Sequence, residues 1–356
     1  DIAKLREEKR KINEQIAKLD QKAIKLKEER DKIRYLIGNL LDPEVPEGKS
    51  EADNVVIKQV GKPREFNFTP LTHDEIARKL DWLDIERAAK VAGARFYYLK
   101  REGALLARIL AAYAIKFLLK KGFILMLVPE LMKTQLMKGA AELAAFEEML
   151  YKIEGKDLYL IATAEQPLAA YYADEILEAA KLPQRFCAVS SCYRVEAGSH
   201  GKDTKGIFRV HQFDKVEQFI FCKQEESKKE FKGLIKNCEE LYKKLEIPYR
   251  IVSICAGELN DNAALKYDLE AWFPAINKYR ELVSCSNCTD YQARKLNIRY
   301  WDGKEKRVVH TLNSTAIACQ RCLACLMELN QAKDGLKLPK VLAKELGTDW
   351  IEYRKK

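Results

Sequence analysis

The fold is decided by residues 186–219, which read FCAVSSCYRVEAGSHGKDTKGIFRVHQFDKVEQF. At both ends of this stretch, aromatic and β-branched residues alternate with polar ones, which is the period-two pattern of a strand. Between the two ends lies a polar loop, residues 197–206, that contains Gly198, Gly201 and Gly206. A strand, a glycine-bearing loop and a second strand predict an antiparallel β-hairpin.

Period two also predicts which side chains share a face of this hairpin. Arg194 and Glu196 fall on one face of the first strand. A sheet face that carries several charges makes a poor apolar core, because charged groups are rarely buried without a partner. We therefore predict that this face binds a ligand with phosphates, a flat ring and an amine. The side chains on the matching face of the second strand are Arg209, His211, Phe213, Lys215 and Glu217.

The composition describes a folded protein of two or three domains. The chain has 356 residues, of which 47% are hydrophobic and 33% charged, and its net charge of +10 favours a polyanionic partner. Residues 104–128 are the most apolar stretch, but Arg108 and Lys116 interrupt it, and no run reaches the ~20 apolar residues that span a bilayer. Because the sequence also begins without a signal-peptide pattern, we expect a cytoplasmic protein with no membrane segment.

The ten cysteines include two groups with a spacing typical of metal ligands. Cys285-x-x-Cys288 and Cys319-x-x-Cys322-x-x-Cys325 could hold zinc or an iron–sulfur cluster. However, Cys322 and Cys325 follow a predicted helix start, where their spacing puts them on one packed face as small apolar residues. We expect reduced thiols and no zinc.

Residues 1–41 have the pattern of a coiled-coil helix. Apolar residues recur mostly at steps of three and four from Ile2 to Leu40, and only Lys9 and Arg30 interrupt the seam. One helix of this length would be about 60 Å long and would need a partner for its apolar seam. A structural or dimerisation coiled coil is the simplest interpretation. Residues 42–62, rich in proline and glycine, follow as a linker to the main domain, residues 63–356.

The main domain is predicted to contain both helices and strands. Helices are expected at residues 72–92, with Thr72 and Asp74 available as caps, and at 103–121, 167–180, 224–245 and 322–330. Strands are expected at residues 96–99, 123–128, 157–162, 249–255, 268–273, 279–284, 297–301 and 306–312.

Thr163 and Glu165 follow the strand at residues 157–162 and point the same way. In that position they can hydrogen-bond a small hydroxyl group and an ammonium group. Thr163 equally suits the N-cap of the helix that follows, with Glu165 and Gln166 behind it. The residues alone leave both interpretations open.

Taken together, these patterns resemble the signature motifs of class II aminoacyl-tRNA synthetases. Residues 192–219 are similar to the second motif, and the run from HQF through KVE resembles seryl-tRNA synthetases of the common bacterial, archaeal and eukaryotic type. Residues 103–128 resemble the first motif, a dimer interface, and residues 313–330 resemble the third, in which Arg321 lies near a helix start. The resemblance extends from about residue 41 to the C-terminus. It implies an α+β fold, with an antiparallel β-sheet flanked by helices and preceded by the coiled-coil helix.

The resemblance also implies a function for residues 1–41. In seryl-tRNA synthetases a long helical arm grips the extra-long variable arm of tRNA(Ser). That arm normally has two antiparallel helices, whereas residues 1–41 resemble the second, returning helix. Either the first helix is absent from this chain, or a turn is hidden near Asp20 and Gln21.

The reaction implied by the resemblance has two steps. The serine carboxylate attacks the α-phosphorus of ATP to give seryl-adenylate, and the 3′ end of tRNA(Ser), or of tRNA(Sec), then takes the seryl group. A homodimer and Mg²⁺, held with ATP by Glu281 and Ser284, are implied as well, and Arg194, Arg321 and Glu281 would be catalytic. The residues implied to bind serine are Thr163, Glu165, Arg194, Glu217, Asn313 and Thr315. The residues implied to bind ATP are Arg194, Glu196, Arg209, Val210, Phe213, Glu281, Ser284 and Arg321.

Three residues depart from the family pattern. Ser314 and Ala316 replace glycine found in many relatives, and Gln320 replaces a small residue. We expect all three beside the nucleotide, where they would tune the affinity for ATP. Two other functions stay open: a ligase that loads an amino acid onto a carrier protein, and a non-catalytic paralogue of the synthetases.

Overall fold

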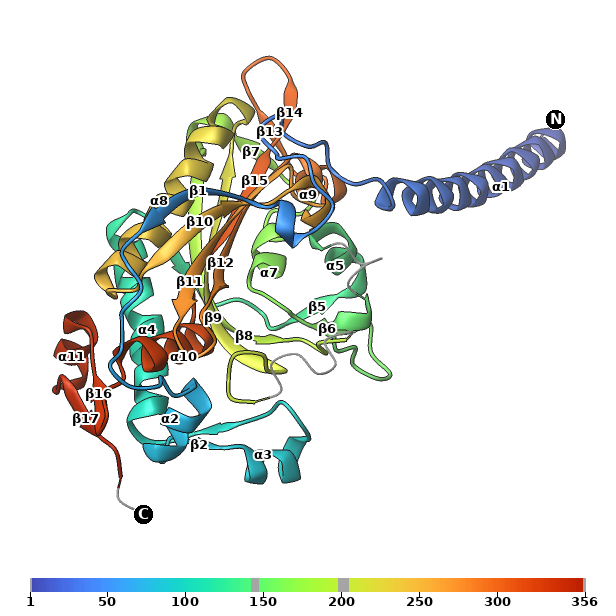
Figure 1. The fold of residues 1–356 in the computed structure, drawn as a ribbon. Helices are drawn as coiled ribbons and strands as arrows, with labels where there is room; N and C mark the ends of the chain where they lie inside the picture. Colours follow the sequence, from blue (N-terminus) through green and yellow to red (C-terminus); the bar gives the residue numbers. More distant parts are fainter. Residues whose placement is uncertain (1, 142–146, 198–204, 355–356) are drawn as a thin grey trace. The chain divides into compact units, whose positions relative to one another are not determined.

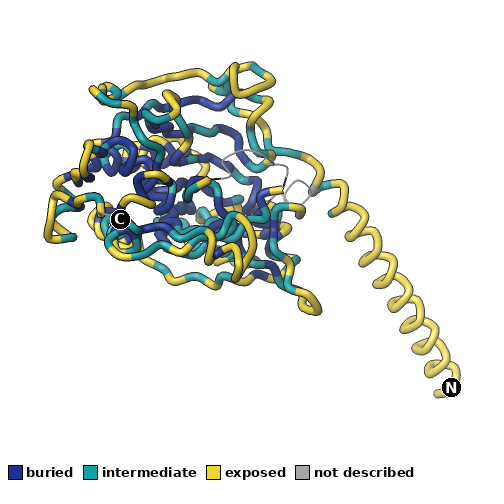
Figure 2. Tube along the Cα trace, turned by 60° about the horizontal axis from the view of Figure 1, so that its bottom comes forward, coloured by how far each residue is buried: buried dark blue, intermediate teal, exposed yellow. Residues whose placement is uncertain are grey.

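The computed structural model describes residues 2–141, 147–197 and 205–354, which form two compact units, 1–38 and 39–356. The first unit is the helix α1 (Ile2–Tyr35), which runs without interruption. A hidden turn near Asp20 and Gln21 is therefore excluded. Figure 2 shows α1 exposed along almost all of its length. This includes its apolar residues; Ile12, for example, is 55% exposed and Leu19 65%.

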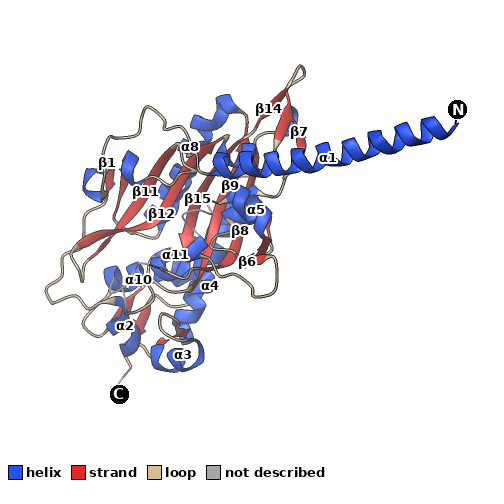
Figure 3. Ribbon diagram, turned by 90° about the vertical axis from the view of Figure 1, so that its right-hand side faces the viewer, coloured by secondary structure: helices blue, strands red, loops and turns tan. Residues whose placement is uncertain are grey.

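The second unit is built on an eight-stranded β-sheet in the order β1-β10-β11-β12-β15-β9-β8-β4 (Figures 1 and 3). Each strand pairs antiparallel with its neighbour, except that β4 and β8 are parallel. The predicted antiparallel sheet flanked by helices is confirmed. The strands are β1 (Val55–Val60), β4 (Ile124–Met126), β8 (Gln184–Tyr193), β9 (Gln212–Cys222), β10 (Tyr249–Ser253), β11 (Leu265–Phe273), β12 (Lys278–Thr289) and β15 (His310–Ala318).

Strand β9 shows how the two faces of the sheet differ. Val216 and Ile220 belong to a core that also holds apolar residues of α4, α8 and α10, whereas Phe219 and Phe221 belong to a second core with α5, α7 and α9. Figure 1 shows the two groups of helices on opposite sides of the sheet. The alternation follows from the period of a strand. The helices are α4 (Arg101–Lys120), α5 (Thr134–Ala140), α7 (Glu165–Ala169), α8 (Ser227–Lys244), α9 (Tyr291–Lys295) and α10 (Cys319–Asn330).

Smaller elements complete the second unit. A strand pair precedes α7, and a helix with two short strands ends the chain. A three-stranded sheet includes a hairpin within residues 297–308, whereas residues 310–312 of the predicted second strand belong to β15 of the main sheet. Their bounds are β5 (Leu131–Lys133), β6 (Leu158–Leu160), β7 (Ile176–Glu178), β13 (Arg299–Trp301), β14 (Lys306–Val308), β16 (Gly335–Lys337), α11 (Lys340–Leu346) and β17 (Trp350–Glu352).

The single helix predicted at residues 72–92 is wrong, because two short helices occupy this range. Thr72 caps α2 (His73–Lys79) in a capping box with Glu75, as expected for this threonine, whereas Asp74 is not a cap. Asp81, with a φ of 55°, then turns the chain, and its carboxylate pairs with Lys100 at 2.5 Å. Strand β2 (Leu83–Asp84) separates α2 from α3 (Ile85–Ala92) and pairs with β3 (Tyr98–Leu99), which follows α3.

Two further predictions are corrected. The helix expected at residues 167–180 ends at Ala169; turns follow up to Asp174 (φ 63°), and the chain continues into β7, which pairs with β13. The linker expected at residues 42–62 includes β1, an edge strand of the main sheet that pairs with β10. Residues 55–60 therefore belong to the sheet.

The ten cysteines are all buried and free of disulfides. Cys285 lies in the core that packs against α8 and α10, whereas Cys288 contacts Asn313 on the other side of the sheet. The two thiols therefore do not converge. Within the described ranges no three His, Cys, Asp or Glu side chains are grouped as metal ligands would be. In the same part of the chain, every helix is too short or too polar to span a bilayer.

Candidate active site

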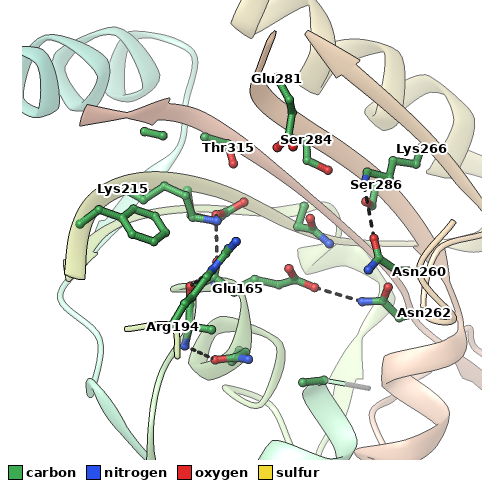
Figure 4. A pocket seen from close by; sticks show the side chains of 18 of the residues that line it. Glu165, Arg194, Lys215, Asn260, Asn262, Lys266, Glu281, Ser284, Ser286 and Thr315 are labelled. Carbon is green, nitrogen blue, oxygen red and sulfur yellow. Dashed lines mark hydrogen bonds and ion pairs between the residues drawn. The ribbon is translucent and has the colours of Figure 1, made fainter. Parts of the chain in front are cut away.

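A cavity of about 240 Å³ opens on the sheet face that carries Glu217 and Thr315 (Figure 4). Residues from β9, β12 and β15 line it together with the loops that follow β6 and β8. The structure thus brings together residues that are far apart in the sequence. The predicted residues that line the cavity are Thr163, Glu165, Arg194, Phe213, Glu217, Glu281, Ser284, Asn313, Thr315 and Arg321.

The β-hairpin that frames the cavity has shorter strands than predicted. Strand β8 ends at Tyr193 and β9 begins at Gln212, so Arg194, Glu196 and Arg209 lie outside the paired strands. The backbone N–H of Arg194 nevertheless donates to the carbonyl of His211 at 2.9 Å. Glu196 has a φ of 54°, which redirects the chain after β8. The shared strand face predicted for Arg194 and Glu196 is therefore wrong, and Gly198 and Gly201 lie outside the described residues.

Strand β9 supplies Phe213, Lys215 and Glu217 to the cavity in the predicted alternation. The Glu217 carboxylate is only 1% exposed. Its Oε2 accepts a hydrogen bond from the hydroxyl of Thr163 at 3.1 Å and forms an ion pair with Lys215. A carboxylate beside a cation and a hydroxyl still has acceptor capacity on its oxygens for a further donor.

The loop after β6 places Thr163 at the cavity next to Glu165, the first residue of α7. The N-cap of α7 is Ala164, without a side-chain cap, so the N-cap role predicted for Thr163 is wrong. The hydroxyl oxygen of Thr163 accepts from the backbone N–H of Glu165 at 3.2 Å, and its hydrogen is directed to Glu217. Burial, reinforced by the charge of Glu217, raises the pKa of Glu165 to about 7. Glu165 is therefore near its titration point at neutral pH.

Glu281 and Ser284 both face the cavity although they are three residues apart on β12. A regular strand would direct them to opposite faces. The register with β11 shifts between Leu269 and Glu270, so Leu282 is an extra residue on β12 and forms a β-bulge. The bulge brings the carboxylate and the hydroxyl to one wall, where two oxygen ligands could hold a Mg²⁺ ion.

Arginines lie above and beside the aromatic rings of the site. The guanidinium carbon of Arg194 lies 5.2 Å from the centre of the Phe213 ring, and that of Arg321 lies 4.9 Å from the Phe208 ring. Arg321 Nη1 is also 3.5 Å from Glu281 Oε1. Burial opposes the charged form of Glu281, but Arg321 and its neighbouring cations lower the pKa of this carboxyl overall.

A small hollow next to the cavity contains the remaining predicted residues. Glu196, Arg209 and Val210 line it, together with Phe213 and Arg321 from the main cavity. Arg209 Nη1 donates to Glu196 Oε2 at 2.8 Å. All the predicted site residues therefore line either the cavity or this adjoining hollow.

The residues that depart from the family pattern do not all lie where we expected. Ser314 contacts Cys238, on the side of the sheet that packs against α8, and Ala316 lies in that same core. The expectation that both flank the nucleotide is therefore wrong, because the alternation along β15 turns them away from the cavity. Gln320 does line the adjoining hollow, where its side chain accepts from the backbone N–H of Asp214 at 2.8 Å.

Sequence reasoning missed several polar residues that line the cavity. Lys215 lay on the predicted strand face but was given no function. For Lys266 and the amides of Asn260 and Asn262, no motif gave a signal, since loop geometry alone brings the two amides to the cavity. Burial opposes the charge of Lys266, but Asp268 and Glu281 raise the pKa of its ammonium.

The fold and the site together define a class II aminoacyl-tRNA synthetase core. Residues 149–330 match the family model described as the tRNA synthetase class II core domain (G, H, P, S and T). The serine–tRNA ligase of Methanosphaera stadtmanae is 49% identical to this chain over 338 residues, which cover 94% of this chain and 79% of that protein.

Solved structures agree with this assignment. The seryl-tRNA synthetase of Pyrococcus horikoshii complexed with ATP has a TM-score of 0.92 and 43% identity, covering 97% of this chain and 83% of the other. The cytoplasmic serine–tRNA ligase of Naegleria fowleri in complex with AMP has a TM-score of 0.89 and 42% identity, covering 94% and 81%. The chain belongs to the serine–tRNA ligase family.

Proposed function

We propose that the chain activates L-serine with ATP to form seryl-adenylate and pyrophosphate, and then transfers the seryl group to the 3′ end of tRNA(Ser) with release of AMP. The observation that carries this proposal is the convergence of Arg194, Phe213, Glu217, Glu281 and Thr315 on one cavity. The relatives named above show which family the chain belongs to, and two of their solved structures are complexes with ATP or AMP. The same chemistry allows tRNA(Sec) as a second acceptor of the seryl group.

In this proposal ATP lies across the main cavity and the hollow beside it. The adenine ring stacks on Phe213, with the Arg321 guanidinium over its other side, and Glu196 accepts from the adenine amino group. Val210 lines the same hollow, and Arg209 contacts the distal phosphates. Displacement at a phosphorus atom requires alignment and charge neutralisation more than covalent help.

Arg194 is proposed to bridge the α-phosphate and the serine carboxylate. A guanidinium can donate two parallel hydrogen bonds, so it can hold both reacting groups in line. The residue is anchored at its backbone through His211 and lies over Phe213. The attacking carboxylate is already ionised, so no general base is required.

Mg²⁺ fits the oxygen ligands on the β12 wall of the cavity. Glu281 and Ser284 would hold the ion with the ATP phosphates. When bound, Mg²⁺ neutralises part of the charge that develops on the phosphates. The chain's own part is to keep Glu281 ionised, for which Arg321 lies at 3.5 Å.

Selection of serine is proposed to rest on the hydrogen-bonding groups at the floor of the cavity. Glu165 and Glu217 would receive the ammonium group, while Thr163, Asn313 and Thr315 would surround the hydroxyl. A site that bonds a hydroxyl rejects alanine strongly, because its buried polar groups would otherwise lack a partner.

Pyrophosphate exchange with a panel of amino acids tests this function. We expect exchange that depends on serine and Mg²⁺ and that alanine and glycine do not support. Exchange with alanine or glycine instead of serine would favour a ligase that loads a carrier protein. No exchange with any amino acid would leave a non-catalytic paralogue.

The N-terminal helix α1 is proposed to bind the long variable arm of the tRNA. Its residues are almost all exposed, and residues 1–38 form a unit separate from the catalytic residues. The test compares binding of tRNA(Ser) with binding of the same tRNA lacking its variable arm. We expect the shortened tRNA to bind more weakly; equal affinities would contradict a tRNA-binding arm.

A homodimer is proposed to form through the region that resembles the first motif. Strand β4 is an edge of the main sheet, and the apolar residues Ile124 and Leu127 near it are 52% and 85% exposed. Exposed apolar side chains on an edge strand favour pairing with another chain. Light scattering should give twice the chain mass, and Leu127→Glu should reduce it; a monomer at all concentrations would contradict the dimer.

A further inference from the structure

One carboxylate oxygen of Glu165 accepts hydrogen bonds from two side-chain amides. Gln292 Nε2 donates to Glu165 Oε1 at 2.9 Å, and Asn262 Nδ2 donates to the same oxygen at 3.4 Å. Among the described residues no hydrogen bond reaches the other oxygen, Oε2. Figure 4 shows the Glu165 side chain in the cavity with its carboxylate turned toward Asn262.

Gln292 is itself fixed in one orientation. The residue lies in α9 and is fully buried. Its amide nitrogen donates to the carbonyl of Ala140 at 2.9 Å as well as to Glu165, and its amide oxygen accepts from the Thr311 hydroxyl at 2.8 Å. With both N–H groups and the oxygen engaged, the amide cannot rotate without losing hydrogen bonds. Gln292 is therefore a rigid support for Glu165.

We propose that Gln292, assisted by Asn262, is a positioning residue that binds Oε1 of Glu165 and leaves Oε2 directed into the cavity for the ammonium group of the amino acid. This inference rests on the proposed function, since it assigns the two amides to the serine pocket. Neither residue was among those expected to contact a substrate, and Gln292 does not line the cavity. It would act only through Glu165.

Several charged and titratable groups face Glu165 from the elements around it. They are Glu217 and Lys215 on β9, Arg194 after β8 and the thiol of Cys288 on β12. Burial and Glu217 raise the pKa of Glu165 to about 7, while Lys215, the Gln292 amide and Arg194 oppose the rise. An amide N–H that donates to a carboxylate stabilises its ionised form. Removing the amide should therefore raise the pKa of Glu165 further.

The consequence is a measurable link between pH and serine binding. An ammonium group binds well only to an ionised Glu165, so the affinity for serine should fall as pH decreases through the pKa of this carboxyl. In the wild-type protein we expect this fall near pH 7, in line with the pKa of about 7. Without Gln292 the same fall should occur at a higher pH.

The experiment measures pyrophosphate exchange from pH 6 to pH 9 for wild type, Gln292→Met and Asn262→Ala. For Gln292→Met we expect the serine KM at pH 7 to rise about tenfold, as for the loss of one hydrogen bond to a charged group, with the ATP KM unchanged. Its serine KM profile should also move to higher pH. Asn262→Ala should act in the same direction but less, because its contact is longer, at 3.4 Å.

Gln218→Met is the matched control. Gln218 is another fully buried glutamine, but its side chain bonds Asn237 and Cys238 on the α8 side of the sheet. This variant should lose stability without moving the pH profile of the serine KM. The stabilisation of each variant by serine alone, measured as a shift in melting temperature without ATP, gives a readout independent of catalysis.

The outcomes separate the inference from the function on which it rests. If wild type responds to serine but Gln292→Met and Asn262→Ala leave the serine KM and its pH profile unchanged, the inference is overturned and the function stands. If Gln218→Met shifts the profile as much as Gln292→Met does, the effect is general loosening and the inference is likewise overturned. If wild type neither binds nor activates serine, the proposed function fails, and the inference with it.

Discussion

The hydroxyl of Thr163 donates a hydrogen bond to Glu217 Oε2 over 3.1 Å and thereby joins the loop after β6 to the middle of β9. The same carboxylate is paired with the buried ammonium of Lys215. Two chain segments more than 50 residues apart thus meet at one buried carboxylate. The geometry of the proposed serine pocket depends on this contact.

Replacing Thr163 tests the contact directly. Thr163→Val has almost the same shape but leaves Glu217 and the Glu165 N–H each without one hydrogen bond. We expect a loss of about 1–3 kcal/mol in the free energy of unfolding, and a serine KM that rises while the ATP KM does not. Denaturant unfolding and steady-state exchange measure the two effects. Thr163→Ser, which keeps the hydroxyl, should resemble wild type; if both variants behave alike, the contact has no such role.

Glu165 should make the protein less stable as pH rises. Its pKa is raised to about 7, so between pH ~4.5 and ~7 the folded chain binds a proton that the unfolded chain has released. The free energy of unfolding should therefore fall across this window. Glu165→Gln removes the effect and should be more stable than wild type at pH 8, by up to about 3 kcal/mol.

The same two proteins should converge below pH ~4.5, where the wild-type carboxyl is protonated in both states. Denaturant titrations at several pH values measure this difference. A constant difference at every pH would mean that Glu165 does not titrate as its burial implies. The variant should also lose serine-dependent exchange, because a neutral amide cannot pair with an ammonium group.

Arg194→Ala should abolish adenylate formation while the fold stays intact. We expect kcat/KM for exchange to fall at least a hundredfold, the scale found for removing a group that stabilises developing charge. Arg185→Ala is the matched control: Arg185 lies on β8, the strand that precedes Arg194, but pairs with Glu230 at 2.7 Å, away from the cavity. An unchanged rate for Arg194→Ala would show that the ligand does not meet this guanidinium.

His73 should affect ATP rather than serine. Its Nε2 accepts from the backbone N–H of Ile207 at 3.2 Å, and Nδ1 contacts Glu328 at 3.1 Å, so α2 supports the segment that carries Phe208 and Arg209. His73→Ala leaves the buried N–H of Ile207 without its partner, while Glu328 loses the imidazole but keeps the backbone N–H of residue 73, and we expect a loss of about 1–3 kcal/mol in stability. The ATP KM should rise and the serine KM should not; parallel changes in both would indicate only general loosening.

Much of the site could be predicted because strand periodicity determines which residues share a face. Phe213, Lys215 and Glu217 alternate along β9, and all three line the cavity. The same rule fails where the backbone is irregular. Glu281 and Ser284 lie on the same wall of the cavity only because of the β-bulge at Leu282, and no residue type in the sequence predicts that bulge. Their assignment came from the resemblance alone.

Long-range packing limited the prediction of the fold. The helical pattern at residues 72–92 was broken by Asp81, whose positive φ is stabilised by ion pairs to Lys100 and Arg101 about 20 positions later. In the same way, residues 55–60 look like a linker in sequence and become a strand because β10 offers an edge. The amide of Gln292 shows the same limit in the site, since its contact with Glu165 spans 127 positions.

A crystal structure with a non-hydrolysable seryl-adenylate analogue tests the central claim most directly. We predict that the adenine ring stacks on Phe213 beneath Arg321, that Arg194 contacts the bridging group, and that the ammonium group meets Glu165 and Glu217. An analogue bound elsewhere, or bound here with its ammonium group away from both carboxylates, would contradict the account.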